Sequence, residues 1–173
     1  IALEAALADL EAQGPIDQLW FLGDFAAFGP RPAECIARVR ALIAEADVLF
    51  CKGADAELLF GCEGEPEARV RALARLTRAA TVISTFGERG AVLLQGGVYS
   101  HAPALPVTIV DRIGSGDALA AGVLDGILDG DPAAGLRRGV ALAAIALSQH
   151  GDQVLTSRAE LAGVMAQQRV DVA

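Results

Sequence analysis

Positive charge is the first thing that this sequence has little of. Its 173 residues include 14 basic and 22 acidic ones, which gives a net charge of -8 at neutral pH. Lys52 is the single lysine, and every other basic residue is an arginine. A field of this sign repels the phosphates of nucleic acids and the headgroups of anionic membranes, so we expect neither as a partner.

Long apolar runs, paired cysteines and aromatic side chains are also scarce. The run Val140–Leu147 is too short to cross a bilayer, and no basic-then-apolar leader is present, so we expect a cytoplasmic protein. Cys35, Cys51 and Cys62 are odd in number and lack zinc-like spacing, so we expect reduced thiols. Hydrophobic residues make up 53% of the chain and aromatic ones only 5%, which favours helices packed closely on a sheet.

Hydrophobic spacing predicts a chain of alternating helices and strands. The expected helices cover residues 1–13, 33–44, 54–60, 65–76, 118–130, 133–149 and 156–168. The expected strands cover residues 17–22, 47–51, 81–85, 91–94, 98–101 and 107–110. This order predicts a single α/β domain over residues 1–173, a three-layer α/β/α sandwich whose Rossmann-like, mostly parallel sheet has an antiparallel edge.

The stretch from Asp111 to Asp117 (DRIGSGD) is the one whose residues indicate chemistry. The small residues Gly114, Ser115 and Gly116 allow backbone N–H groups to converge at the start of the following helix. Such a helix start binds phosphate, sulfate or a similar anion. Asp117 would lie beside that anion, where a carboxylate can act as general base on an attacking hydroxyl. The pattern fits equally well an Asp that only occupies a favourable first-turn position.

The same stretch resembles the carboxy-terminal signature of the ribokinase-like (PfkB) carbohydrate kinases, 2-keto-3-deoxygluconate kinases among them. The resemblance runs from about residue 44 to residue 168, and it includes ADVLFCKGADAELLFG at 46–61 and TVISTFGERG at 81–90. It implies that the glycine-rich turn is an anion hole for the transferred phosphate and that Asp117 is the catalytic base. It also implies ATP or ADP with Mg²⁺ as the ligand.

The resemblance further implies where the nucleotide would be contacted. Thr85, Gly87 and Gly90 correspond to a turn that passes under the nucleotide, although most Gly-x-x-Gly turns only join two strands. His150 corresponds to a position at the adenine pocket. Together with Gly151 it fits equally well an ordinary helix C-cap.

Two residues depart from the kinase pattern. The family carries Asn-x-x-Glu after the strand at 47–51, where it organises magnesium and phosphate, and here Lys52 and Asp55 occupy those positions. Lys52 would either neutralise a phosphate or block the metal, and the plainer interpretation is a solvated loop lysine. Asp55 keeps the charge with a shorter reach, which makes it a weak candidate metal ligand.

Residues 1–43 carry a second resemblance, to a fragment of the calcineurin-like metallophosphoesterases. A Gly-Asp at a strand end makes Asp24 a weak candidate metal ligand, and Gly-Pro-x-Pro follows at 29–32. The further histidines that such a dinuclear site requires are missing, since the only histidines are His101 and His150.

Two family fragments, 1–43 and 44–173, therefore predict an engineered or recombined chimera with no complete active site and no native catalytic activity. Two alternatives stay open. One is a residual module that binds ATP, ADP, phosphate or sulfate through residues 85–90 and 114–117. The other is an active carbohydrate kinase. Because part of the sheet would lack its usual cover, we also expect self-association into a homodimer.

Overall fold

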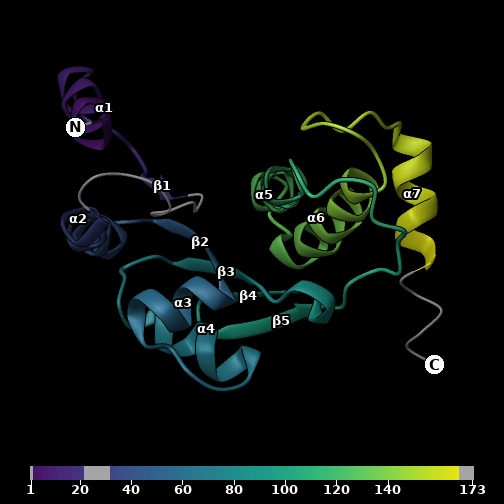
Figure 1. Cartoon of the computed structure of the whole chain (residues 1–173), viewed down its shortest axis with the longest axis horizontal. Helices are drawn as coiled ribbons and strands as arrows, with labels where there is room; N and C mark the ends of the chain where they lie inside the picture. The colour runs from purple at the N-terminus through teal and green to yellow at the C-terminus, as the bar shows by residue number, and fades with distance from the viewer. Residues whose placement is uncertain (1, 22–31, 168–173) are drawn as a thin grey trace.

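The computed structural model describes residues 2–21 and 32–167 (Figure 1). Its helices are α1 (Ala2–Ala12), α2 (Pro32–Ala44), α3 (Gly53–Phe60), α4 (Pro66–Ala74), α5 (Ser115–Leu128), α6 (Pro132–Leu147) and α7 (Arg158–Gln167), with one 3₁₀ turn, η1 (Gly87–Arg89). Its strands are β1 (Trp20–Phe21), β2 (Val48–Lys52), β3 (Thr81–Thr85), β4 (Ala91–Gln95) and β5 (Val98–Ala102). Within the described residues, no helix is long and apolar enough to cross a membrane.

All five strands belong to one sheet, in the order β1-β2-β3-β4-β5. The β1–β2 and β2–β3 pairs are parallel, and the β3–β4 and β4–β5 pairs are antiparallel. The turn between β4 and β5 holds Gly96 and Gly97 at φ of 55° and 84°, the positive values that a two-residue hairpin turn requires. The antiparallel strands therefore extend one edge of a parallel core.

Side chains alternate across the sheet and build two separate apolar clusters. Leu49 and Val82 point to the face covered by α2, α3 and α4, where side chains such as Val70 of α4 pack on them. Phe50 and Ile83 point to the opposite face, which α5 and α6 cover. Figure 1 shows the same arrangement, with α3 and α4 on one side of the strands and α5 and α6 on the other. The three-layer sandwich with an antiparallel edge that the sequence predicts is thus confirmed.

Helices α5 and α6 approach each other at backbone distance because glycines face one another. A Cβ built on Gly122 would lie 2.4 Å from the backbone nitrogen of Gly139, and one built on Gly126 would lie 2.2 Å from the Cα of Gly135. Helix α6 is therefore buried against a second helix as well as the sheet, as its nearly all-apolar sequence predicts. This contact fixes the position of α5, whose amino terminus carries the glycine-rich stretch.

The prediction of a strand at 107–110 is wrong. The N–H groups of Val110 and Asp111 both donate to the carbonyl oxygen of Leu147, at 2.8 and 3.3 Å, so the end of α6 holds this segment in place of a neighbouring strand. Of the first predicted strand, 17–22, the residues before Trp20 are not part of β1, and the N–H of Leu19 donates to the Asp47 carboxylate at 2.7 Å; residue 22 lies outside the described residues. By contrast, β3 matches the predicted strand at 81–85 residue for residue.

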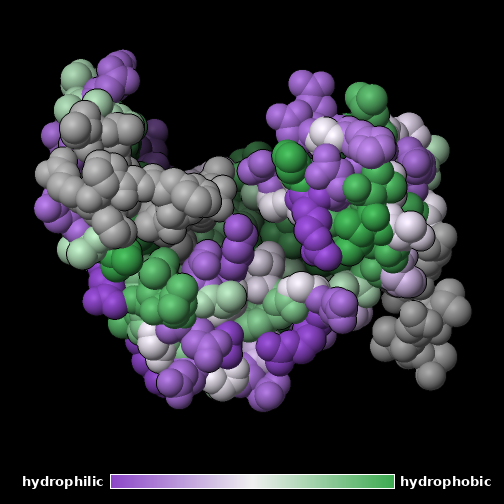
Figure 2. Space-filling view, in the orientation of Figure 1, coloured by the Kyte–Doolittle hydropathy of each residue, from purple (hydrophilic) through white to green (hydrophobic). Residues whose placement is uncertain are grey.

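The molecule is hollowed on the face shown in Figure 2. The hollow lies beside the end of the molecule that carries α5, α6 and α7. Three apolar side chains of the segment before α5, Ile109, Val110 and Ile113, are between 45% and 62% exposed. The loop that leads into α5 is therefore bordered by apolar surface.

Candidate functional site

The glycine-rich stretch forms the amino-terminal end of α5. Gly114 is the N-cap and adopts a left-handed conformation, with φ 77° and ψ -10°, and the helix begins at Ser115. The first intrahelical bond runs from the Ala118 N–H to the Gly114 carbonyl at 2.9 Å. The N–H groups of residues 115–117 precede this bond, so they have no acceptor within the helix and point along its axis. Together with the helix dipole they form a concentration of positive partial charge that attracts an anion.

Asp117 and Gly116 lie where the sequence predicts them, in the first turn of α5, and both are exposed. A carboxylate in the first turn of a helix lies at the positive end of the helix dipole, which is a favourable position for an acidic side chain. The start of α5 therefore places an exposed carboxylate next to a set of N–H donors.

Asp111 fixes the shape of this loop by joining it to the segment after α6. Its carboxylate accepts hydrogen bonds from the N–H groups of Ile113, at 3.1 Å, and Gly151, at 3.2 Å. These two donors, Ile113 first, hold the pKa of Asp111 below its ordinary value. Gly114 contributes a second contact, because a Cβ there would lie 2.5 Å from the carbonyl oxygen of Asp152. Only glycine meets both the positive φ and the close approach.

Ser115 and His150 are placed by the same two segments. The Ser115 hydroxyl donates to the carbonyl oxygen of Arg112 at 3.0 Å, which closes the turn before α5. His150 is exposed and lies just beyond the end of α6, next to Gly151. The structure thus brings residues 111–117 and His150 to neighbouring loops.

Thr85, Gly87 and Gly90 form a second turn, at the carboxyl end of β3. Thr85 is the last residue of the strand, Gly87 begins η1 with φ 59°, and Gly90 follows η1 with φ 84°. A Cβ on Gly90 would lie 2.1 Å from the carbonyl oxygen of Ala102, so this glycine lets the turn rest on β5. Within the described part of the chain, no hydrogen bond or ion pair joins this turn to residues 114–117. The two turns are related through the sheet, where Ala91 and Leu119 share one apolar cluster.

Lys52 and Asp55 lie beside this turn. Lys52 is the last residue of β2, is exposed, and pairs in register with Thr85 at the carboxyl ends of two parallel strands. Asp55 is half-buried in the first turn of α3. Ligands of open α/β sheets bind at such carboxyl ends. No group of three or more His, Cys, Asp and Glu side chains in the described residues is arranged to hold a metal ion, and Asp24 lies outside those residues.

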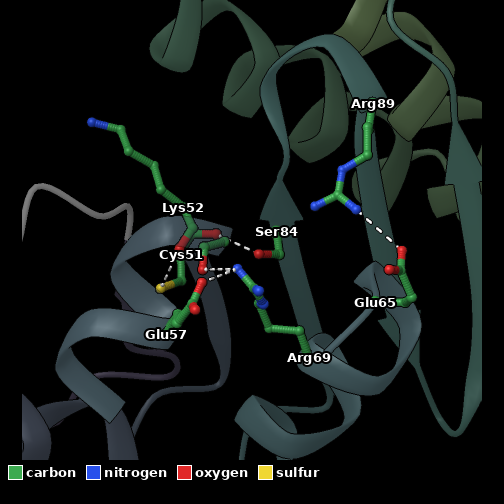
Figure 3. A network of polar contacts seen from close by, with 8 residues as sticks. Cys51, Lys52, Glu57, Glu65, Arg69, Ser84 and Arg89 are labelled. Carbon is green, nitrogen blue, oxygen red and sulfur yellow. Dashed lines mark hydrogen bonds and ion pairs between the residues drawn. The ribbon is translucent and has the colours of Figure 1, made fainter. Parts of the chain in front are cut away.

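Arg69 was not expected near the site. The sequence places it on the polar face of α4, yet its side chain is only 12% exposed. It lies 2.9 Å from the Glu57 carboxylate and donates to the Gly53 carbonyl at 2.9 Å (Figure 3). Helical spacing carries no signal for such a contact, because Arg69 reaches a different helix across the layer.

Cys51 is the most perturbed titratable group near α3. The residue is 3% exposed, and burial, reinforced by Asp55 and Cys62, raises the pKa of its thiol from 9.0 to about 12. Burial likewise raises the pKa of Cys62. Both thiols therefore stay protonated at neutral pH, in line with the unpaired cysteines of the structure.

This shift makes stability depend on pH. The Cys51 thiol of the folded chain keeps its proton above pH 9 while that of the unfolded chain loses it, so the stabilisation is complete below pH 9 and declines as pH rises towards 12. When pH rises from 8 to 10.5, we expect the unfolding free energy of Cys51→Ala to fall by about 2 kcal/mol less than that of the wild type. Urea titrations at both pH values measure it. Equal losses in the variant and the wild type would contradict the assignment.

Comparison with known proteins gives one matching family model. It is described as "pfkB family carbohydrate kinase" and matches residues 25–158.

Curated relatives, among them the following two, match a similar stretch. A 2-dehydro-3-deoxygalactonokinase of Haloferax volcanii is 29% identical over 135 residues, which cover 78% of this chain and 42% of the relative. A cytidine kinase of Thermococcus kodakarensis is 33% identical over 125 residues, which cover 68% of this chain and 43% of the relative. The chain thus spans less than half the length of the curated relatives it matches.

Solved structures share the fold. A 2-dehydro-3-deoxygluconokinase of Thermotoga maritima superimposes with a TM-score of 0.71 at 21% identity, over 95% of this chain and 55% of that one. A ribokinase II of E. coli, in complex with ATP and Mg²⁺, superimposes with a TM-score of 0.66 at 22% identity, over 78% of this chain and 44% of that one.

These comparisons overturn the prediction of a chimera without catalytic activity. The family match covers residues 25–158 and so spans the expected junction near residue 43. Both curated relatives are kinases. Nothing supports a metallophosphoesterase fragment in residues 1–43, where the resemblance rested on a Gly-Asp and a Gly-Pro-x-Pro, short patterns in a helix-strand-helix arrangement that many α/β proteins share.

Proposed function

Because the chain belongs to the pfkB family of carbohydrate kinases, we propose that it binds ATP and transfers the terminal phosphoryl group to a hydroxyl of a sugar or sugar acid. The observation that carries the proposal is the start of α5. There, Gly114 in a left-handed conformation places three N–H groups at a helix amino terminus, one of them that of Asp117.

In this proposal the anion hole formed by Gly114, Ser115 and Gly116 receives the transferred phosphoryl group. The acceptor's hydroxyl oxygen bonds to the terminal phosphorus of ATP, and the bond from that phosphorus to ADP breaks. The Asp117 carboxylate accepts the proton that this hydroxyl loses. The N–H groups stabilise the charge that develops on the phosphoryl oxygens. Because the N–H groups and Asp117 lie in the same first turn of α5, the base is next to the bound phosphoryl group.

The nucleotide is proposed to lie between the two turns. Thr85, Gly87 and Gly90 would line its phosphates, and His150 would lie near its base. The exposed apolar surface of Ile109, Val110 and Ile113 beside the loop fits an aromatic base.

Magnesium fits this site through the phosphates. Mg²⁺ is held in kinases by one or two carboxylates together with phosphate oxygens and water, so a single carboxylate is a sufficient protein contribution. Asp55, in the first turn of α3, would supply it. Lys52, at the end of the neighbouring strand, would add a positive charge facing the phosphates. The ion's contribution is to neutralise phosphate charge during transfer.

The acceptor is proposed to be a 2-dehydro-3-deoxy sugar acid. A curated relative and a solved structure of this fold both carry the names of kinases for such acids. Cytidine is the second candidate, because a relative with 33% identity is a cytidine kinase.

A radiolabelled ATP assay tests the acceptor. We expect transfer of the terminal phosphate to 2-dehydro-3-deoxygluconate or 2-dehydro-3-deoxygalactonate in excess of transfer to cytidine, ribose or fructose. Preferred transfer to cytidine would show that the acceptor is a nucleoside and not a sugar acid. ADP binding without transfer to any acceptor would refute catalysis by this chain and leave nucleotide binding alone.

Other expectations from the sequence stay predictions. They are the single domain over residues 1–173, the cytoplasmic location and the homodimer. The dimer has one structural argument in its favour, since β1 is an edge strand of the sheet.

A further inference from the structure

Arg69 occupies an unusual place for a charged residue. Its guanidinium Nη1 lies 2.9 Å from the Glu57 carboxylate and 2.9 Å from the Gly53 carbonyl oxygen, both in α3. Its Nε is buried and has no hydrogen-bond partner. An unpaired buried donor costs stability, and replacing a buried ion pair by apolar side chains of similar volume is often neutral or stabilising. The burial of Arg69 is therefore weak evidence for a role in stability, and its contacts point to a role in positioning.

Phe86 links Arg69 to the second turn of the site. The Arg69 guanidinium lies 5.8 Å from the centre of the Phe86 ring, within the range of a cation–π contact. The same ring touches the start of α3, because a Cβ on Gly53 would lie 2.4 Å from it. The Arg69 side chain thus contacts both Gly53, which follows Lys52, and Phe86, which follows Thr85.

Arg89 ties the far side of the same turn to α4. Its guanidinium lies 5.3 Å from the centre of the Phe86 ring and 3.1 Å from the carboxylate of Glu65, the N-cap of α4. Figure 3 shows Arg69 directed towards Glu57 and Arg89 directed towards Glu65. The imidazole of His101 contacts the Arg89 carbonyl oxygen at 2.8 Å. Helix α4 and its N-cap therefore contact the turn at both ends, through Arg69 and Phe86 and through Glu65 and Arg89.

We infer that Arg69 is a positioning residue, which couples the amino-terminal turn of α3, with Lys52 and Asp55, to the nucleotide turn of residues 85–90 through Phe86. The inference rests on the proposed function. In this inference α4, which lies outside the proposed site, sets the distance between Lys52 and Asp55 and the turn of residues 85–90. Arginine suits this task because its planar group binds carboxylate and carbonyl oxygens and stacks on a ring at the same time, which lysine does not do.

Calorimetric titration with ADP, with and without Mg²⁺, tests the coupling. We expect Arg69→Met to weaken ADP binding by about three- to thirtyfold and to reduce the enhancement of affinity by Mg²⁺. Arg69→Lys keeps the charge but loses the stack, and we expect it to recover only part of the affinity. The matched control is Arg71→Met on the same helix, which removes an exposed ion pair with Glu67 and should leave ADP affinity unchanged.

A second measurement does not require nucleotide. Hydrogen exchange of the folded chain should quicken in Arg69→Met at the amides of residues 53–55 and 87–90 together, with β4 and β5 unchanged. Phe86→Leu should produce the same pattern, and adding it to Arg69→Met should have little further effect. Unchanged exchange in both turns, or additive effects in the double variant, would overturn the inference. If the wild-type chain binds no ADP, the proposed function fails while hydrogen exchange still decides the coupling.

Discussion

Replacing Asp117 with Asn is expected to lower phosphoryl transfer by about 10²–10⁴-fold, the usual contribution of a general base. The side chain keeps its size and its exposed position in the first turn of α5, so the helix start should be unchanged. ADP affinity should therefore stay close to that of the wild type. It is expected to rise slightly if it changes, because a negative charge next to the phosphates has been removed.

Asp125→Asn is the matched control for this variant. Asp125 lies on the same helix and is paired with Arg138 of α6, away from the helix start. Its loss should cost at most an exposed ion pair and leave transfer intact. Single-turnover measurements with labelled ATP separate the chemical step from product release. An Asp117→Asn protein that transfers phosphate at more than a third of the wild-type rate would rule out Asp117 as the base.

Gly114→Ala is expected to damage both stability and nucleotide binding. Its φ of 77° is unfavourable for any residue with a Cβ, at a cost of about 1–2 kcal/mol. Its Cβ would also lie 2.5 Å from the carbonyl oxygen of Asp152 and force the two loops apart. Such overpacking costs about 1–3 kcal/mol more, so the total loss of unfolding free energy is about 2–5 kcal/mol.

Gly130 offers a control with the same φ. It also has a φ of 77°, but a Cβ there meets nothing within 4 Å. Gly130→Ala should therefore lose only about 1–2 kcal/mol and bind ADP as the wild type does. Urea unfolding of both variants measures the difference. Equal losses would mean that the contact between Gly114 and Asp152 has no energetic role.

Local sequence signals were sufficient for much of the fold. The β-branched run at 81–85 became β3 with the same bounds. Asp131, directly before Pro132, caps α6 and accepts a hydrogen bond from the Ala134 N–H at 2.9 Å. The start of α5 followed from the conformational freedom of Gly114. Each of these features depends on residues close together in the chain, which is why the sequence contains them.

Features that depend on contacts between distant parts of the chain could not be predicted from the sequence. Residues 107–110 have the composition of a strand, but their hydrogen bonds go to Leu147 at the end of α6. Arg69 has the spacing of a solvent-facing residue, but it reaches across to Glu57 on α3. Both errors arise because tertiary packing decides between local alternatives of similar energy.

The interpretation as a chimera failed for a related reason. The Gly-Asp at a strand end and the Gly-Pro-x-Pro after it are short patterns, and α/β folds of many families repeat such helix-strand-helix units. The family match over residues 25–158 outweighs them because it extends over most of the chain. Which residues bind and react stays a proposal, since that question turns on ligands.

Calorimetric titration of the unaltered chain with ADP in the presence of Mg²⁺ tests the central claim most directly. The account predicts saturable binding of one ADP per chain, which inorganic phosphate weakens by competing for the N–H groups at the start of α5. The absence of saturable heat up to millimolar ADP would contradict the claim that this helix terminus binds a nucleotide.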